Sequence, residues 1–144
     1  MWYDLETNDP QRLAHSRTLL NQWLRELPSQ TNIPLAKTFL LGFSQGAAMT
    51  LEVGLSLPLG GLISLSGYWH GQPRPGVAEF PAVLIVHGRL DQVVPLAAAG
   101  EIRQVLDEWG VFYQYEELAI GHEITPEVLD LVHNFIVNCT QSKG

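Results

Sequence analysis

Apolar residues follow two different periods along the chain, and each change of period marks the boundary of a predicted element. Short continuous apolar runs predict strands at 38–41, 62–66, 82–86 and 111–118. Apolar residues at helical spacing predict helices at 10–27, 47–57, 95–109 and 126–140. The resulting order is a helix, a strand–helix pair, a strand, and two more strand–helix pairs. Such alternation predicts an α/β layer fold, a three-layer sandwich with a mostly parallel sheet of about four strands.

Prolines and glycines mark the ends of the predicted helices. Asp9 before Pro10 is typical of a helix start. Pro28 predicts the end of the same helix, because the residue before a proline is disfavoured in the α region. Pro58 and Gly110 predict the ends of the second and third helices. The first helix is expected to bury an apolar stripe formed by Leu13, Leu20, Trp23, Leu24 and Leu27.

Length and composition narrow the class of protein. A chain of 144 residues predicts a single domain over 1–144. Apolar residues make up 46% of the chain and charged residues 16%, which argues against disorder. The formal charge is −7, without a cluster of Lys or Arg. Binding to nucleic acid or to an anionic membrane surface therefore has no electrostatic basis, and we expect neither partner.

The chain carries one cysteine, Cys139, which excludes an intrachain disulfide and a thiolate metal site. Its spacing places it on the apolar face of the last predicted helix. We recognise no signal peptide and no long apolar span, so we expect no membrane insertion and a cytoplasmic location. No spacing of His, Cys, Asp and Glu is typical of a metal site, and no Gly-rich nucleotide motif is present. We expect neither metal nor cofactor.

The sequence Gly-Phe-Ser-Gln-Gly at 42–46 lies between the first predicted strand and the second predicted helix. In this strand–turn–helix context, G-x-S-x-G predicts a nucleophile elbow, which holds Ser44 in a strained conformation over the end of a parallel sheet. We expect Gly42 and Gly46 to avoid collisions between the crossing strand and helix. The backbone N–H of Gln45 is the candidate donor to an oxyanion.

Three polar residues follow the ends of three predicted strands: Ser44 the first, Asp91 the third and His122 the last. Ligands of parallel α/β sheets bind beyond these carboxyl ends. The chain order Ser, Asp, His is the order of α/β-hydrolases. We therefore predict that His122 takes the proton of the Ser44 hydroxyl and that Asp91 orients the imidazole.

Each of these residues also has a structural interpretation. Asp91 could cap a turn or helix before Pro95, and His122 could be a loop histidine bound to backbone. The other histidines are weaker candidates for the base. His87 is expected to order the loop that carries Asp91, and the remaining three are expected to be structural or solvated: His15, His70 and His133.

With these residues in place, the chain resembles the phospholipase/carboxylesterase family of α/β-hydrolases, the group that includes acyl-protein thioesterases. Trp2-Tyr3-Asp4 is similar to the family's W-[FY]-D segment, and Gly42 to Gly46 to its elbow. His87-Gly88 through Asp91 to Val94-Pro95 resembles its acid loop, and Gly121-His122-Glu123 its histidine loop. The resemblance implies hydrolysis of small carboxylic esters or thioesters through an acyl-enzyme, without a cofactor.

The resemblance also implies elements that come before the W-[FY]-D segment, including a loop with a second oxyanion donor and a strand beside 38–41. The chain begins at Met1-Trp2, so we expect an N-terminally truncated form of the fold. Loss of one oxyanion donor would lower activity about 10²–10³-fold. An uncovered apolar edge at 38–41 would favour pairing with another chain, and a homodimer is one hypothesis.

Candidate substrate contacts are Tyr68 and Trp69, which follow a strand end, with Leu90 and Val94 in the acid loop and Trp2 near the start. They could line an apolar pocket or, for the two aromatic residues after the strand, only cover the core. Three functions remain: a serine esterase or thioesterase, a catalytically impaired or non-enzymatic α/β-hydrolase remnant that binds a partner, and a flavodoxin-like binding domain. The last leaves the three strand-end residues unexplained.

Overall fold

The structure, a computed structural model, describes residues 10–142. Four strands form one sheet: β1 (Phe39–Phe43), β2 (Gly61–Leu65), β3 (Ala82–Gly88) and β4 (Tyr113–Leu118). The helices are α1 (Pro10–Thr31), α2 (Gln45–Gly54), α3 (Ala97–Trp109) and α4 (Pro126–Ser142), with a short 3₁₀ turn, η1 (Leu35–Lys37), before β1. Each predicted strand and helix is present, with shifted ends.

The strands lie in the order β1-β2-β3-β4, and every neighbouring pair is parallel. Phe39 pairs with Gly61 at the start of β2, and Gly61 pairs with Ala82 at the start of β3. All four strands therefore end at the same edge of the sheet, where their connecting loops gather. The predicted α/β fold with a four-stranded parallel sheet is confirmed.

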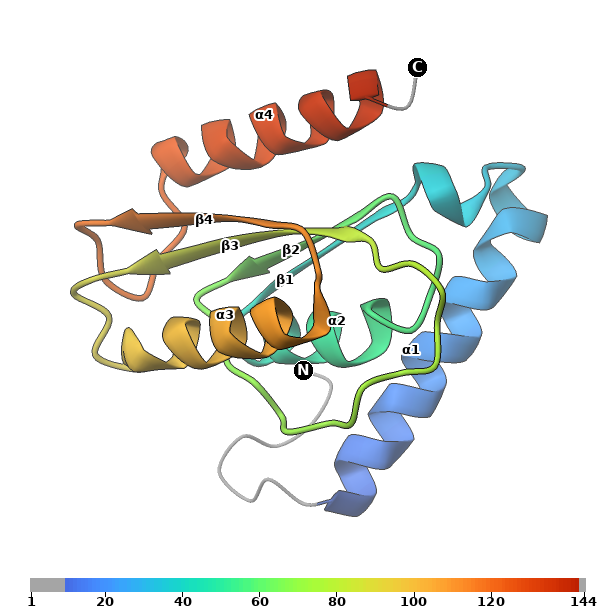
Figure 1. The fold of residues 1–144 in the computed structure, drawn as a ribbon, viewed down its shortest axis with the longest axis horizontal. Helices are drawn as coiled ribbons and strands as arrows, with labels where there is room; N and C mark the ends of the chain where they lie inside the picture. The colour runs from blue at the N-terminus through green and yellow to red at the C-terminus, as the bar shows by residue number, and fades with distance from the viewer. Residues whose placement is uncertain (1–9, 143–144) are drawn as a thin grey trace.

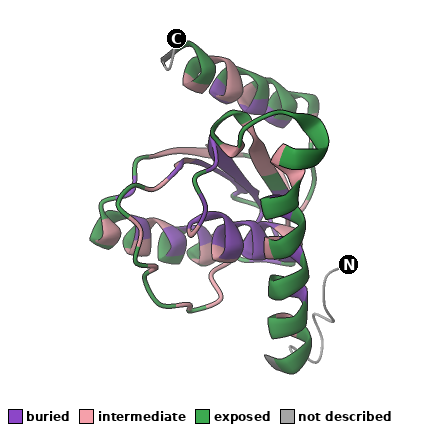
Figure 2. Cartoon of the chain, turned by 90° about the vertical axis from the view of Figure 1, so that its right-hand side faces the viewer, coloured by how far each residue is buried: buried purple, intermediate pink, exposed green. Residues whose placement is uncertain are grey.

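Helices cover both faces of the sheet and make three layers (Figure 1). The face toward α2 and α3 packs Leu62, Val83 and Ile85 against Met49 and Ile102. Among the described helices, α4 packs on the opposite face, through the residues Ile63, Leu65, Leu84, Val86, Val128, Val132 and Phe135. β2 and β3 are buried on both faces, which explains their continuous apolar sequence. Figure 2 shows the same distribution: α2 is almost wholly buried, whereas α1 and α4 are exposed on their outer sides.

Two expectations for the first helix are wrong. The helix continues through Pro28 to Thr31, and Asn32 ends it with a positive φ of 60°. Beyond the proline, the Ser29 and Thr31 hydroxyls donate to the carbonyls of Glu26 and Leu27, at 2.8 Å each. Trp23 was expected in the buried stripe but is 52% exposed. Of that stripe, only Leu20 and Leu24 are buried.

The other helix ends agree more closely with the sequence. α2 ends at Gly54, four residues before the expected stop at Pro58, and residues 55–57 form turns. α3 ends at Gly110, whose φ of 71° is the left-handed conformation that favours glycine. Thr125 accepts a hydrogen bond from the Val128 N–H at the start of α4. The Asp9 cap lies outside the described residues. Within 10–142, no helix is both long enough and apolar enough to cross a membrane.

Candidate active site

Ser44 lies between β1 and α2, in a conformation that few residues adopt. Its φ is 59° and its ψ is −118°, and its N–H donates to the Leu65 carbonyl at the end of β2. A positive φ in a non-glycine residue is strained and persists only where the surrounding structure enforces it. The bond to β2 and the immediate start of α2 supply that enforcement. The hydroxyl is thereby presented at the carboxyl edge of the sheet.

The two glycines of the turn differ in what they allow. A Cβ on Gly42 would lie 2.1 Å from the Gly46 carbonyl oxygen, so β1 can cross the start of α2 only with glycine at this position. At Gly46 the expected steric need is wrong. An added Cβ there meets no described atom within 4 Å. The close approach of strand and helix therefore depends on Gly42.

Gln45 is the first residue of α2. The first N–H groups of a helix have no carbonyl partner within the helix, and they carry the positive end of its dipole. The Ala47 and Ala48 N–H groups donate to the Ser44 carbonyl, which places Ser44 at the N-terminal end of the helix. The N-terminus of α2 can therefore stabilise negative charge beside Ser44.

Asp91 follows β3 in a tight loop that binds its carboxylate from the backbone. Its Oδ1 accepts hydrogen bonds from the N–H groups of Val93, at 2.9 Å, and Val94, at 2.8 Å. The side chain is fully shielded from solvent. Burial raises the pKa of this carboxyl, but the bonds from Val94, His122 and Val93 outweigh burial and hold the pKa below its usual value of 3.8. Asp91 is therefore a carboxylate at neutral pH.

His87, the last residue but one of β3, holds the other end of the same loop. Its Nε2–H donates to the Val94 carbonyl at 2.8 Å, and the ring is completely buried. The same nitrogen lies 3.7 Å from Asp91 Oδ2. The prediction that His87 orders the acid loop is confirmed. His87 does not reach Ser44 through any hydrogen bond that we observe.

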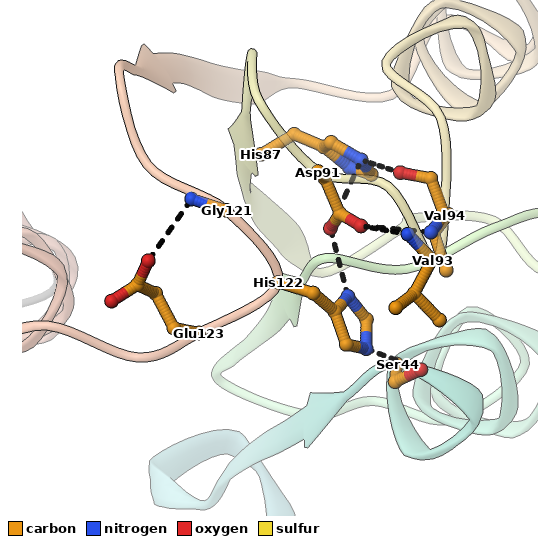
Figure 3. A network of polar contacts seen from close by, with 8 residues as sticks. All are labelled: Ser44, His87, Asp91, Val93, Val94, Gly121, His122 and Glu123. Carbon is orange, nitrogen blue, oxygen red and sulfur yellow. Dashed lines mark hydrogen bonds and ion pairs between the residues drawn. The ribbon is translucent and has the colours of Figure 1, made fainter.

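His122 connects the other two polar residues (Figure 3). Its Nδ1 is 2.8 Å from Asp91 Oδ2, and its Nε2 is 3.1 Å from Ser44 Oγ. Because a carboxylate only accepts, Nδ1 carries the proton and Nε2 is left to accept from the serine hydroxyl. The structure thus joins the three predicted side chains in one hydrogen-bonded row, each from the end of a different strand.

Backbone bonds hold the histidine loop against the acid loop. The Arg89 and Leu90 N–H groups donate to the carbonyls of Leu118 and Ile120, at 2.7 and 3.0 Å. Within the histidine loop, the Glu123 carboxylate accepts from the Gly121 N–H at 3.0 Å. The imidazole keeps limited contact with solvent, since its side chain is 16% exposed. These contacts hold His122 within hydrogen-bond distance of both Asp91 and Ser44.

The residues predicted to contact substrate lie in different surroundings. Leu90 is 62% exposed in the acid loop, whereas Val94 is buried and holds Asp91 and His87 through its backbone. Trp69 packs against Trp109 at the end of α3, with ring centroids 5.3 Å apart, and so lies against the core as the alternative interpretation required. Tyr68 packs against His70, at 5.5 Å. Trp2 lies outside the described residues. A role in substrate binding stays a prediction for all five.

Two residues near the site were not predicted from the sequence. The Phe43 ring lies 4.7 Å from the His122 ring, and Val93, beside Asp91, is 61% exposed. Phe43 occupies the first variable position of G-x-S-x-G, which was the available signal. Among the described residues, no three His, Cys, Asp or Glu side chains gather as a metal ion requires.

Comparison with known proteins identifies the family of the chain. A sequence profile described as Phospholipase/Carboxylesterase matches residues 1–140. The chain belongs to the phospholipase/carboxylesterase family. Curated relatives of this family member include acyl-protein thioesterase 1 homolog 1 of Dictyostelium discoideum, 30% identical over 94% of the chain. Acyl-protein thioesterase 1 of Eremothecium gossypii is 32% identical, also over 94% of the chain.

Solved structures of the family share the fold. Esterase PE8 is 32% identical, with a TM-score of 0.82 over 90% of this chain. SOBER1 of Arabidopsis thaliana has a TM-score of 0.83 over 92% of the chain at 24% identity, a likeness in fold alone. The chain spans 66% and 61% of the lengths of the two curated thioesterases, and 62% of the PE8 chain.

Proposed function

We propose that this family member is a serine hydrolase that cleaves carboxylic esters or thioesters. The observation that carries the proposal is the row of two hydrogen bonds from Ser44 Oγ through His122 to Asp91, at 3.1 and 2.8 Å. The names of the curated relatives, which are acyl-protein thioesterases, support the same class of substrate.

The reaction begins at Ser44 Oγ, which attacks the carbonyl carbon while its proton passes to His122 Nε2. The carbonyl oxygen becomes negative, and the Gln45 N–H donates to it from the start of α2. The Asp91 carboxylate stabilises the imidazolium through Nδ1. The imidazolium then protonates the alkoxide or thiolate as its bond to the carbonyl carbon breaks, so that an alcohol or thiol leaves and an acyl-serine remains. Water, deprotonated by the same imidazole, hydrolyses the acyl-serine and frees Ser44.

The substrate would meet an apolar rim. Leu90 and Val93 of the acid loop are both more than half exposed, and Phe43 borders the imidazole on the strand side. Exposed apolar side chains beside a nucleophile suit an acyl group or a hydrophobic alcohol. A thiolate is a better leaving group than an alkoxide. Hydrolysis of a thioester at this site should therefore depend less on stabilisation of the oxyanion than hydrolysis of an ester.

Labelling with a fluorophosphonate probe tests the proposal. The 144-residue chain and its Ser44→Ala variant would be treated in parallel, with thermal melts to verify folding. We expect covalent modification of the chain and none of the variant. A folded chain that resists the probe would contradict the proposal and favour an impaired or non-enzymatic member of the family.

We also propose that the chain pairs with a second copy through the outer edge of β1. β1 is the first strand of the sheet, its sequence FLLGF has no charged residue, and Leu41 is 45% exposed. The other edge strand, β4, carries Glu116 and Glu117, which oppose edge-to-edge pairing. Sedimentation equilibrium would reveal a dimer. A well-behaved monomer with a cooperative melt would contradict this pairing.

A further inference from the structure

A cavity lies on the side of the sheet that α1, α2 and α3 cover. Its volume is about 440 Å³, within the range of roughly 300–1,000 Å³ that small-molecule sites occupy. Its walls come from α1, α2, the end of α3 and the loop at 68–81. Its polar lining includes Arg17, Glu52, His70, Gln72 and Arg74. Ser44, Asp91 and His122 do not line it, so this cavity is separate from the proposed active site.

Arg17, Glu52 and His70 form one wall of the cavity, with the Glu52 carboxylate at its centre. The Glu52 side chain is only 6% exposed, and its two oxygens lie 3.3 Å from Arg17 Nη2 and 3.3 Å from His70 Nδ1. The His70 side chain is 5% exposed. A carboxylate is buried in proteins only when partners offset the loss of water. Arg17 and His70 are those partners, and they hold the wall in a fixed arrangement.

Gln72 lines the same cavity and lacks such partners. Both polar atoms of its side-chain amide are buried, and neither forms a hydrogen bond with any described residue. Gly71 before it has a φ of 86°, a left-handed conformation that favours glycine. A buried amide without partners is costly, and such a group in a native protein requires an explanation. A primary amide offers an acceptor beside donors, so its matching group is another amide.

The charges of the lining define the rest of the ligand. The residues that line the cavity carry two guanidinium groups, Arg17 and Arg74, but only one carboxylate, Glu52. The Arg74 guanidinium lies over the Phe80 ring, 5.5 Å from its centroid, whereas Arg17 lies at Glu52. Arg17 is about half exposed, at 48%, and so keeps contact with the mouth of the cavity. A carboxylate fits this position, because guanidinium groups bind carboxylates through paired hydrogen bonds.

The remaining wall is apolar. Leu13 and Leu55 line it, with Trp109 at the end of α3. An aliphatic side chain placed between the amide and the carboxylate would pack there. We propose that this cavity binds an N-acyl amino acid with an aliphatic side chain, either free or as the carboxyl end of a peptide. Its amide pairs with Gln72, its carboxylate pairs with the Arg17 guanidinium at the mouth of the cavity, and its side chain packs on the apolar wall.

Calorimetric titration of the full chain with N-acetyl-leucine tests the proposal. We expect saturable binding with a Kd on the order of 1 mM or tighter. N-acetyl-leucine amide lacks the carboxylate and free leucine lacks the amide, so each should bind at least about tenfold more weakly. A pentapeptide that ends in leucine, compared with its amidated form, distinguishes the two sources of the ligand. Binding only of the free small molecule indicates a metabolite, and equal or tighter binding of the peptide indicates a peptide end.

Two glutamine variants provide the matched comparison. Gln72→Leu keeps the size of the side chain and removes the amide, so it should weaken N-acetyl-leucine at least about tenfold. Gln104→Leu changes an exposed glutamine of α3 that does not line the cavity, and should leave the affinity unchanged. Absence of saturable binding by the folded wild-type chain would overturn the proposal, even if Gln72→Leu fails to fold. Equal affinities of the wild type and a folded Gln72→Leu would overturn it as well.

Discussion

The ring of Phe43 packs against the imidazole of His122, with the ring centroids 4.7 Å apart and the planes inclined at 39°. Phe43 is the last residue of β1 and directly precedes Ser44. The turn that presents the hydroxyl therefore also provides a wall for the base that activates it. Asp91 fixes the imidazole at Nδ1 by a hydrogen bond, and Phe43 restricts the ring from its face.

Replacement of Phe43 by alanine should lower kcat about 10- to 100-fold, because a small displacement of a catalytic group is enough to cost that much. Phe39→Ala is the matched control, since Phe39 lies on the same strand but packs on Phe135 instead, at 6.3 Å. The control should lower the melting temperature and leave kcat nearly unchanged. Equal losses of kcat in the two variants would show that Phe43 has no special role at His122.

Asp91→Asn should lower kcat by about 10⁴-fold, the effect of losing the orienting carboxylate in a serine triad. An asparagine amide can donate to Nδ1, which reverses the tautomer and places a proton on the nitrogen that must accept from Ser44. Steady-state hydrolysis of a short-chain thioester would measure the loss. Asp130→Asn, an exposed position on α4, is the control and should retain full activity. A loss of tenfold or less in Asp91→Asn would exclude this role.

The stability of the chain at acidic pH should depend on Asp91. Its pKa in the folded chain lies below 3.8, so the carboxylate stabilises the fold fully above that value. The contribution is lost as pH falls from 3.8 through the pKa of the folded state. Urea unfolding between neutral and acidic pH should therefore show a smaller acid-induced decrease in Asp91→Asn than in the wild type. Parallel curves for the two proteins would contradict this assignment.

Gly42→Ala should destabilise the fold by about 3 kcal/mol or more, because the new Cβ would overlap the Gly46 carbonyl oxygen. Gly46→Ala should do the reverse. Its Cβ meets no described atom within 4 Å, and alanine in a helix is favoured over glycine by up to about 1 kcal/mol. Denaturant unfolding of both variants measures the contrast. Similar destabilisation by the two substitutions would refute the steric explanation.

Tyr115 should ionise at a higher pH than an unperturbed tyrosine. Burial of Tyr115 and its 2.8 Å hydrogen bond to Glu117 raise its pKa to about 12. Because the folded value exceeds the ordinary value of 10.0, Tyr115 stabilises the fold below that pH, and the contribution is lost as pH rises toward 12. Absorbance titration of tyrosinate should show a late component that is missing in Tyr115→Phe. Titration of all tyrosines near their ordinary pKa would contradict the bond.

The sequence predicted the order of the elements because periodicity reflects which faces are buried. It also predicted the row of Ser44, Asp91 and His122, since parallel strands bring their carboxyl ends to one edge whatever their separation along the chain. Helix ends were predicted less well. At Pro28 the local rule predicts a stop, but the helix continues, with hydroxyl bonds from Ser29 and Thr31 in its last turn.

Packing contacts of aromatic and apolar side chains between distant elements were not predicted from periodicity. Trp23 fits the helical stripe of α1, yet it is 52% exposed. Trp69 lies against Trp109, a partner 40 positions along the chain that periodicity does not identify. The orphaned amide of Gln72 is likewise invisible in the sequence, where it is one polar residue in a Pro- and Gly-rich loop.

The row of polar groups also carries information about folding. Ser44 and His122 are 78 positions apart, and β2 and β3 lie between their strands in the sheet. Contacts of such long sequence separation form only after the entropy of closing a large loop has been overcome. No substructure that lacks β4 can bring the base to the nucleophile. During refolding, Ser44 should therefore become reactive toward a fluorophosphonate only when the last strand docks. The rate at which this covalent labelling appears would measure how fast the sheet is completed.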